Sequence, residues 1–282
     1  MTIEKRMKRL IYRGIYFTLL FCFCAVFIFS ATMLTLHYGQ MAREDREYKR
    51  LAALVADDSP LQRPSGGHTL EPVGTTPIPT QSPQEPVMLE QYRNLYEQNT
   101  DMIGWIRIDD TKIDYPVMYT ADDFYLSHGF DKKGSKSGVP FIDERCTVAP
   151  FGMNTIIYGH HMRNGTMFAD LLKYVDSEYY MEHPIIQFDT LYEKQIFEII
   201  AVFRSQIYLE SDRVFKHYDF LGTDDATVFD KYIANIKAIS LYDTGVIASF
   251  GDELLTLITC AYHTENGQFV LVAKKHHIEQ TE

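Results

Sequence analysis

The sequence lacks the motifs that mark the common metal and phosphate sites. It contains no C-x-x-C, no H-E-x-x-H, no glycine-rich phosphate loop and no G-x-S-x-G nucleophile elbow. His160 and His161 are adjacent, and neighbouring residues do not easily direct both rings at one ion. We therefore expect neither a metal site nor a cofactor.

Basic residues and cysteines are also scarce. Lys and Arg number 27 against 38 Asp and Glu, which gives a net charge of -11. Because nucleic-acid binding requires a clustered basic face, this balance argues against a nucleic-acid partner. Of four cysteines, Cys22 and Cys24 lie in an apolar run, so Cys146 and Cys260 remain for at most one disulfide in the rest of the chain.

A long apolar run near the N-terminus is the first feature that is present. Residues 14–36 carry no charge, and 23 helical residues are long enough to cross a hydrocarbon core of roughly 30 Å. Five basic residues precede the run within residues 1–13, which favours a cytoplasmic N-terminus and an extracellular remainder. The alternative is a cleaved signal peptide, for which Ser30-Ala31-Thr32 is a loose cleavage match. In both interpretations most of the chain is exported across the membrane.

Residues 37–86 read as an extracellular stalk and linker. The charged stretch 37–58 has spaced apolar positions that suit a helix continuing out of the membrane. Residues 59–86 then hold seven of the eleven prolines and predict an extended spacer without a core. The folded domain is expected over residues 87–282.

The sequence pattern of that domain predicts a mainly β fold, either a barrel or a sandwich. After a helical pattern at 89–98, short runs rich in β-branched and aromatic residues alternate with Gly, Asp, Asn and Pro clusters. The predicted strands are 103–108, 113–118, 154–158, 185–188, 195–203, 254–259 and 269–273. A strong helix is expected at 224–240, with cap residues at 223–225, and a second short helix at 166–175.

Cys260 is the candidate nucleophile. It ends an apolar strand-like run, where a residue at a barrel rim can be partly exposed, although a free cysteine more often behaves as a small buried hydrophobe. His160 and His161 follow another predicted strand and Gly159, and a histidine held against a thiol can take its proton. His263 is close to Cys260 in sequence and competes for the role of base.

These residues resemble a known family. Residues 256–260, T-L-I-T-C, resemble the sortase signature T-L-x-T-C, and 154–168 resembles the sortase histidine segment. Segments 104–108, 113–118 and 138–143 and the helix before the last two strands are similar to class B sortases. The resemblance covers about residues 89–275 and the N-terminal anchor.

The resemblance implies an eight-stranded β-barrel and a cysteine transpeptidase, a thiol-protease-like hydrolase and acyltransferase of Gram-positive cells. Cys260 would be the nucleophile, and His160, directly after the glycine, would be the acid and base. The substrates would be secreted proteins with an N-P-x-T or L-P-x-T sorting signal. The acceptor would be a peptidoglycan-precursor amine or a pilin lysine.

Position 268 departs from the family pattern. Class B sortases carry an arginine about eight residues beyond the cysteine, but this chain has Gln268 there and no arginine after Cys260. Gln268 can donate a neutral hydrogen bond to an oxyanion but lacks the charge and planar fork of arginine. We assign Gln268 and, beside the nucleophile, Thr259 as candidate substrate or oxyanion residues. Alternatively Arg204 or Arg213 compensates, or the enzyme is slow or inactive.

Three functions follow from these residues. The first is a membrane sortase that anchors surface proteins to the wall. The second is a pilin-polymerising sortase. The third is a catalytically weak sortase-fold protein that binds signal peptides or assembly partners, and Gln268 is the feature that favours it. Cys146 has no role in the pattern and is expected to be a partly buried loop thiol.

Overall fold

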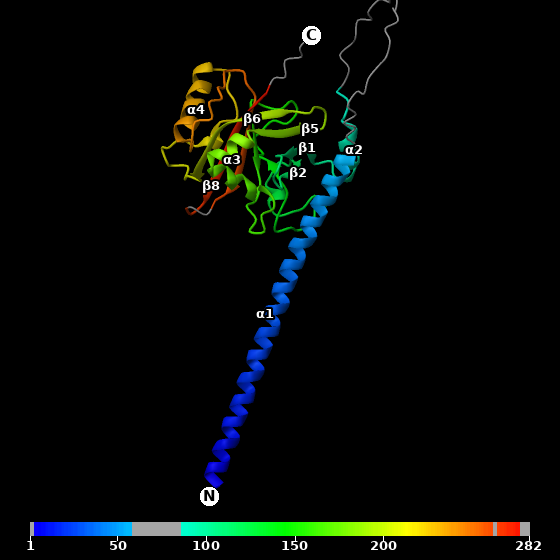
Figure 1. The fold of residues 1–282 in the computed structure, drawn as a ribbon, viewed down its shortest axis with the longest axis vertical. Coiled ribbons are helices and arrows are strands. Elements are labelled where there is room, and N and C mark those ends of the chain that lie inside the picture. Colours follow the sequence, from blue (N-terminus) through cyan, green and yellow to red (C-terminus); the bar gives the residue numbers. More distant parts are fainter. Residues whose placement is uncertain (1–2, 58–85, 262–263, 277–282) are drawn as a thin grey trace, which may run out of the picture. The chain divides into compact units, whose positions relative to one another are not determined.

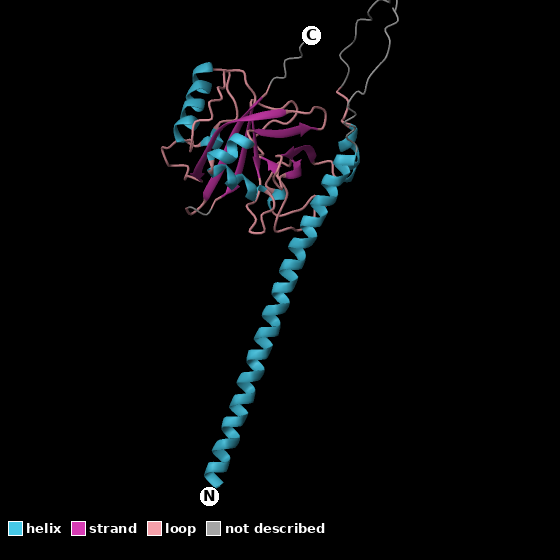
Figure 2. Cartoon of the chain, viewed as in Figure 1, coloured by secondary structure: helices cyan, strands magenta, loops and turns pink. Residues whose placement is uncertain are grey.

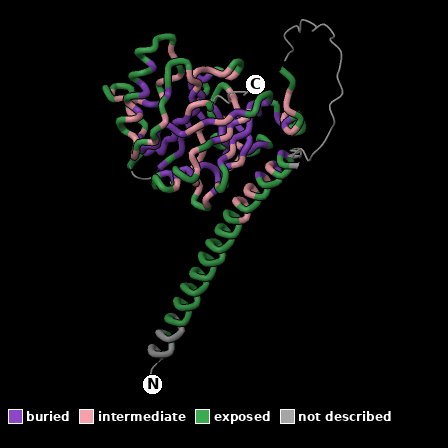
Figure 3. Tube along the Cα trace, turned by 45° about the horizontal axis from the view of Figure 1, so that its top comes forward, coloured by how far each residue is buried: buried purple, intermediate pink, exposed green. Residues whose placement is uncertain are grey.

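The computed structural model describes residues 3–57, 86–261 and 264–276. The chain divides into two compact units, Met1–Glu47 and Tyr48–Glu282. Helix α1, Ile3–Asp57 (Figure 1), contributes residues to both units, and its residues 12–38 are exposed along their whole length (Figure 3). By length and composition α1 can cross a membrane, as predicted from residues 14–36. The predicted proline-rich spacer falls on 58–85, outside the described residues.

The end of α1 is part of the second unit. Tyr48, Leu51 and Val55 are buried in its hydrophobic core, and the unit begins at Tyr48. Their spacing of three and four residues puts the three side chains on one helical face. The stretch that the sequence presents as a charged stalk therefore also carries a narrow apolar stripe that packs.

Eight strands form a closed barrel in the order β1-β2-β3-β4-β7-β8-β6-β5, which confirms the predicted fold (Figure 2). The long central strands are apolar on both faces, because one face fills the barrel and the other is covered by helices and loops. The strands are β1 Met102–Arg107, β2 Asp114–Met118, β3 Phe141–Ile142, β4 Asn154–Tyr158, β5 Ile185–Thr190, β6 Ile196–Gln206, β7 Leu254–Cys260 and β8 Gly267–Lys275.

The helices of the second unit are short except for one. They are α2 Glu90–Gln98, η1 Phe124–Leu126, η2 Phe168–Val175, α3 Ser177–Glu182, η3 His217–Asp219 and α4 Ala226–Ile239, with η marking 3-10 turns. The predicted long helix is α4, and its cap Asp225 accepts a hydrogen bond from the Thr227 N–H. The short helix predicted at 166–175 is the 3-10 helix η2.

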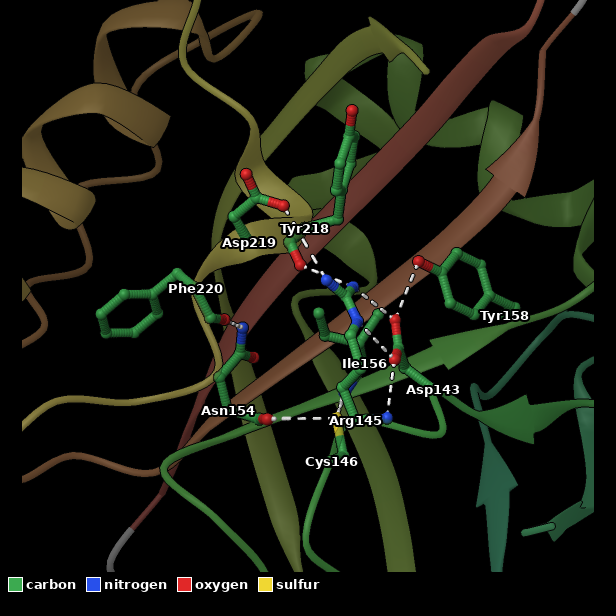
Figure 4. Close-up of polar contacts among 9 residues, drawn as sticks. All are labelled: Asp143, Arg145, Cys146, Asn154, Ile156, Tyr158, Tyr218, Asp219 and Phe220. Carbon is green, nitrogen blue, oxygen red and sulfur yellow. Dashed lines mark hydrogen bonds and ion pairs between the residues drawn. The ribbon is translucent and has the colours of Figure 1, made fainter. Parts of the chain in front are cut away.

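An ion pair between the buried Asp143 carboxylate and the exposed Arg145 guanidinium connects the turn between β3 and β4 to the segment that leads into α4 (Figure 4). Arg145 donates from Nε and Nη2 to the two carboxylate oxygens of Asp143, at 2.9 and 2.7 Å, and from Nη2 to the Tyr218 carbonyl at 2.9 Å. The Tyr158 hydroxyl donates to the same carboxylate at 3.2 Å. Burial alone would raise the pKa of Asp143, but the hydrogen bonds and charge of Arg145 outweigh it and lower the pKa.

We expect Arg145→Ala to lower the free energy of unfolding by roughly 2–3 kcal/mol, because it leaves the Asp143 carboxylate buried without its charged partner. Since the pKa of Asp143 is depressed in the fold, this stabilisation is present above the unfolded value of about 3.9 and is lost as pH falls through the folded value. Urea melts of both proteins between neutral and acid pH measure it.

The matched control is Arg93→Ala, which removes an exposed pair with Glu90 and should cost less than about 0.5 kcal/mol. Equal effects of the two substitutions would contradict the structural role assigned to Arg145.

Candidate active site

Parallel pairing of β4 with β7 brings the two parts of the site to one end of the barrel. The register runs from Asn154 opposite Leu254 to Tyr158 opposite Ile258, and the Gly159 N–H donates to the Ile258 carbonyl at 3.1 Å. His160 and Cys260 are each two residues beyond this last pair. Because parallel strands end on the same edge, segments about 100 residues apart in sequence meet there.

Antiparallel pairing of β8 with β7 brings Gln268 to the same end of the barrel. Cys260 lies directly opposite Gln268 across β7 and β8, and Gln268 lies opposite Ser205 across β8 and β6. Directly opposed residues share one face of a sheet, whereas successive residues alternate. The three side chains of Cys260, Gln268 and Ser205 therefore line one face at the edge where β7 ends.

Cys260 has the exposure that a nucleophile requires. It is the one exposed residue of β7, and it forms no disulfide. Partial burial raises the pKa of its thiol, so the neutral thiol dominates at pH 7. Among the described residues no cationic side chain forms an ion pair or hydrogen bond with it. A base must therefore take the proton before attack.

His160 is held from the side away from the strands. Its Nε2 donates to the Leu126 carbonyl at 2.7 Å, and its own carbonyl accepts from the Phe168 N–H at 2.9 Å. Leu126 ends η1 in the connection between β2 and β3. Because a carbonyl oxygen only accepts, a neutral His160 ring in this pose keeps the lone pair of Nδ1 for a proton. Sequence reasoning gave no signal for this contact, which involves only the backbone of Leu126.

His161 is bound to the backbone of the nucleophile. Its Nδ1 lies 3.2 Å from the Cys260 carbonyl oxygen, which also ties the ends of β4 and β7 together. The pairing of β4 with β7 brings the backbone of both histidines to the end of β7 that carries Cys260, and His263, the third candidate base, lies outside the described residues.

The polar candidates beside Cys260 differ in orientation. Gln268 is only 7% exposed, and its Oε1 is buried with no partner among the described residues. Thr259 is also buried with an unpartnered hydroxyl, but alternation directs it to the face opposite Cys260. Arg204, opposite Phe269, is on that other face too. Arg213 is exposed in the connection between β6 and α4.

Cys146 has a structural setting. It is buried, its sulfur accepts from the Ile156 N–H at 3.4 Å, and its thiol donates to the Asn154 carbonyl at 3.6 Å (Figure 4). Burial raises the pKa of this thiol to about 11. Cys146 is therefore a poor nucleophile that helps to fix β4.

Comparisons with known proteins point to one family. A family model described as "Sortase domain" matches residues 106–276. A Sortase B of Listeria monocytogenes is 36% identical over 191 residues, which cover 66% of this chain and 74% of that protein. The crystal structure of sortase B from B. anthracis superposes with a TM-score of 0.66 at 27% identity, over 86% of this chain and 100% of that chain. The Staphylococcus aureus sortase B–substrate complex, 23% identical, shares the fold with a TM-score of 0.68, over 85% and 99% of the two chains.

We expect alkylation of Cys260 by iodoacetamide to keep accelerating with pH beyond the ordinary thiol pKa of about 8.5, because burial raises the pKa of this thiol. Peptide-resolved mass spectrometry between neutral and alkaline pH measures the rate at each cysteine separately. Buried Cys146 is the internal control and should react far more slowly at every pH. A Cys260 rate that levels off below pH 7 would contradict the assignment of a neutral resting thiol.

Proposed function

Because the chain belongs to the sortase family of cysteine transpeptidases, we propose that it is a membrane-anchored enzyme that cleaves sorting signals of secreted proteins and transfers the acyl product to a cell-wall amine. The observation that carries the proposal is the meeting of Cys260 and the His160 segment at the shared end of β4 and β7. A single exposed thiol beside a histidine pair suits acyl transfer through a thioester.

The proposed reaction uses these residues in two steps. His160 takes the Cys260 proton, and the thiolate attacks the carbonyl carbon of the signal's threonine. The C–N bond then breaks, His160 protonates the departing amine, and a thioacyl enzyme remains. In the second step an incoming amine attacks the thioester, gives a proton to His160 and releases Cys260, which takes the proton back.

Gln268 is the proposed oxyanion donor. The register that sets Gln268 opposite Cys260 supports this role, because the amide N–H of Gln268 would then be close to the developing charge. A neutral amide stabilises an oxyanion less well than a guanidinium. The proposed enzyme is therefore slower than a relative with arginine at this position.

The membrane arrangement is part of the proposal. Residues 1–13 would be cytoplasmic, 14–36 would span the membrane, and 37–86 would connect to the extracellular catalytic domain, 87–282. The uniformly exposed apolar surface of residues 12–38 supports this, because such a surface requires a lipid or protein partner. The hydrolase classification follows if water replaces the acceptor amine.

Incubating the full chain in detergent with N-P-x-T and L-P-x-T peptides should give an acyl adduct on Cys260, detected by mass spectrometry. The full chain is used because Tyr48, Leu51 and Val55 belong to the core. The adduct should disappear in Cys260→Ala and His160→Ala and persist in His161→Ala. Loss in His161→Ala with retention in His160→Ala would show that the wrong base was chosen.

Adding oligoglycine or a lysine-containing pilin peptide to the same assay separates wall anchoring from pilin polymerisation. The binding-only alternative, which Gln268 favours, predicts peptide binding with no adduct in any variant.

Gln268→Arg should retain or increase peptide turnover, and Gln268→Ala should lower kcat about a hundredfold, the usual effect of removing one oxyanion donor. Steady-state kinetics of the three proteins on one matched peptide measure this. Complete loss of turnover in Gln268→Arg would rule out functional substitution by glutamine.

A further inference from the structure

The carbonyl that orients His160 is itself supported by a glycine. Gly138 adopts φ +55°, and a Cβ added there would lie 2.5 Å from the Tyr125 carbonyl oxygen and 2.8 Å from that of Leu126. Only glycine allows this backbone conformation and this close approach together. Gly138 therefore packs directly against the oxygen that accepts the His160 Nε2 hydrogen bond.

Gly138 is in turn hydrogen-bonded to a residue near the end of α1. The Tyr48 hydroxyl donates to the Gly138 carbonyl at 2.6 Å, and Tyr48 is 5% exposed. Tyr48 is the first residue of the compact unit that contains the barrel, directly after the part of α1 assigned to the other unit. A chain of direct contacts thus runs from Tyr48 through Gly138 and Leu126 to the imidazole of His160.

A second set of contacts connects Tyr48 to the segment that carries His160 and His161. Its ring meets Tyr115 edge to face, with centroids 5.4 Å apart. The Tyr115 hydroxyl accepts from the Met167 N–H at 3.0 Å, and Met167 forms an isolated bridge with His161. The next residue, Phe168, donates to the His160 carbonyl. Tyr48 therefore supports both the ring and the backbone of the histidine segment.

We propose that Tyr48, at the end of the membrane-proximal helix, is a positioning residue for His160, so that docking of 48–57 on the barrel completes the active site. This inference rests on the proposed role of His160, and it adds a contribution from residues 48–57, which lie outside the histidine segment and the cysteine signature. Docked, Tyr48 fixes the Leu126 carbonyl and thus the ring orientation and the Nε2–H tautomer. Undocked, the ring loses that constraint and proton transfer slows.

The test is Tyr48→Phe in the full chain in detergent, which removes the hydroxyl and keeps the ring contact with Tyr115. We expect kcat for a sorting-signal peptide to fall roughly three- to tenfold, the range that loss of one hydrogen bond produces, with KM unchanged. Nitrogen-15 NMR of the histidine rings, at a pH where they are neutral, should show a smaller fraction of the Nε2–H tautomer at His160.

The matched control is Tyr180→Phe. Tyr180 is also buried and donates to a backbone carbonyl, that of Thr244 at 3.2 Å, but none of its hydrogen bonds among the described residues involves residues 154–168. Its kcat and His160 tautomer should match those of the parent chain. Thermal melts of both variants check that they are equally folded.

Unchanged kcat or an unchanged tautomer in Tyr48→Phe would overturn the proposal, as would an equal loss in Tyr180→Phe. The NMR comparison needs no substrate, so it separates this proposal from the proposed function. If the parent chain shows no turnover, the sortase activity fails and the tautomer comparison alone decides whether Tyr48 positions His160.

Discussion

The parallel pairing of β4 with β7 is the constraint on which the site depends. Residues 154–158 and 254–258 are far apart in the sequence. Their in-register pairing brings the segment with His160 and His161 to the end of β7 that carries Cys260. A slip by one residue would turn Cys260 to the opposite face. Contacts near the other end oppose such a slip, because Asn154 accepts the Thr256 hydroxyl and donates to the Phe220 carbonyl.

Around this ladder the molecule uses buried polar contacts where hydrophobic packing cannot specify position. Asp143 and Arg145 fix the turn between β3 and β4, and the Cys146 thiol bonds the backbone of β4. On the other side of the histidines, the backbone of Leu126 holds the ring of His160. His160 is thus constrained both by the chain that follows β4 and by the loop that contains Leu126.

Sequence patterns predicted a barrel or a sandwich and the helix α4, because both depend on periodicity. The eight-stranded barrel was implied by the family resemblance, and the pairing of Cys260 with His160, also implied by it, stays a prediction. The sequence patterns missed β3, which has two residues and no periodicity to detect. They also missed the packing of Tyr48. A charged helix with an apolar residue only at every third or fourth position is ordinarily interpreted as an exposed stalk. Contacts made by backbone carbonyls, such as that of Leu126, do not depend on the type of side chain, so the sequence does not predict them.

The central claim is that His160, and not His161, exchanges the proton with Cys260. Imidazole rescue tests it most directly, by measuring the acylation rate of Cys260 in His160→Gly and His161→Gly against added imidazole. The account predicts that His160→Gly is inactive without imidazole and recovers in proportion to its concentration, while His161→Gly acylates without it. Loss and imidazole-dependent recovery in His161→Gly, with His160→Gly unaffected, would contradict the account.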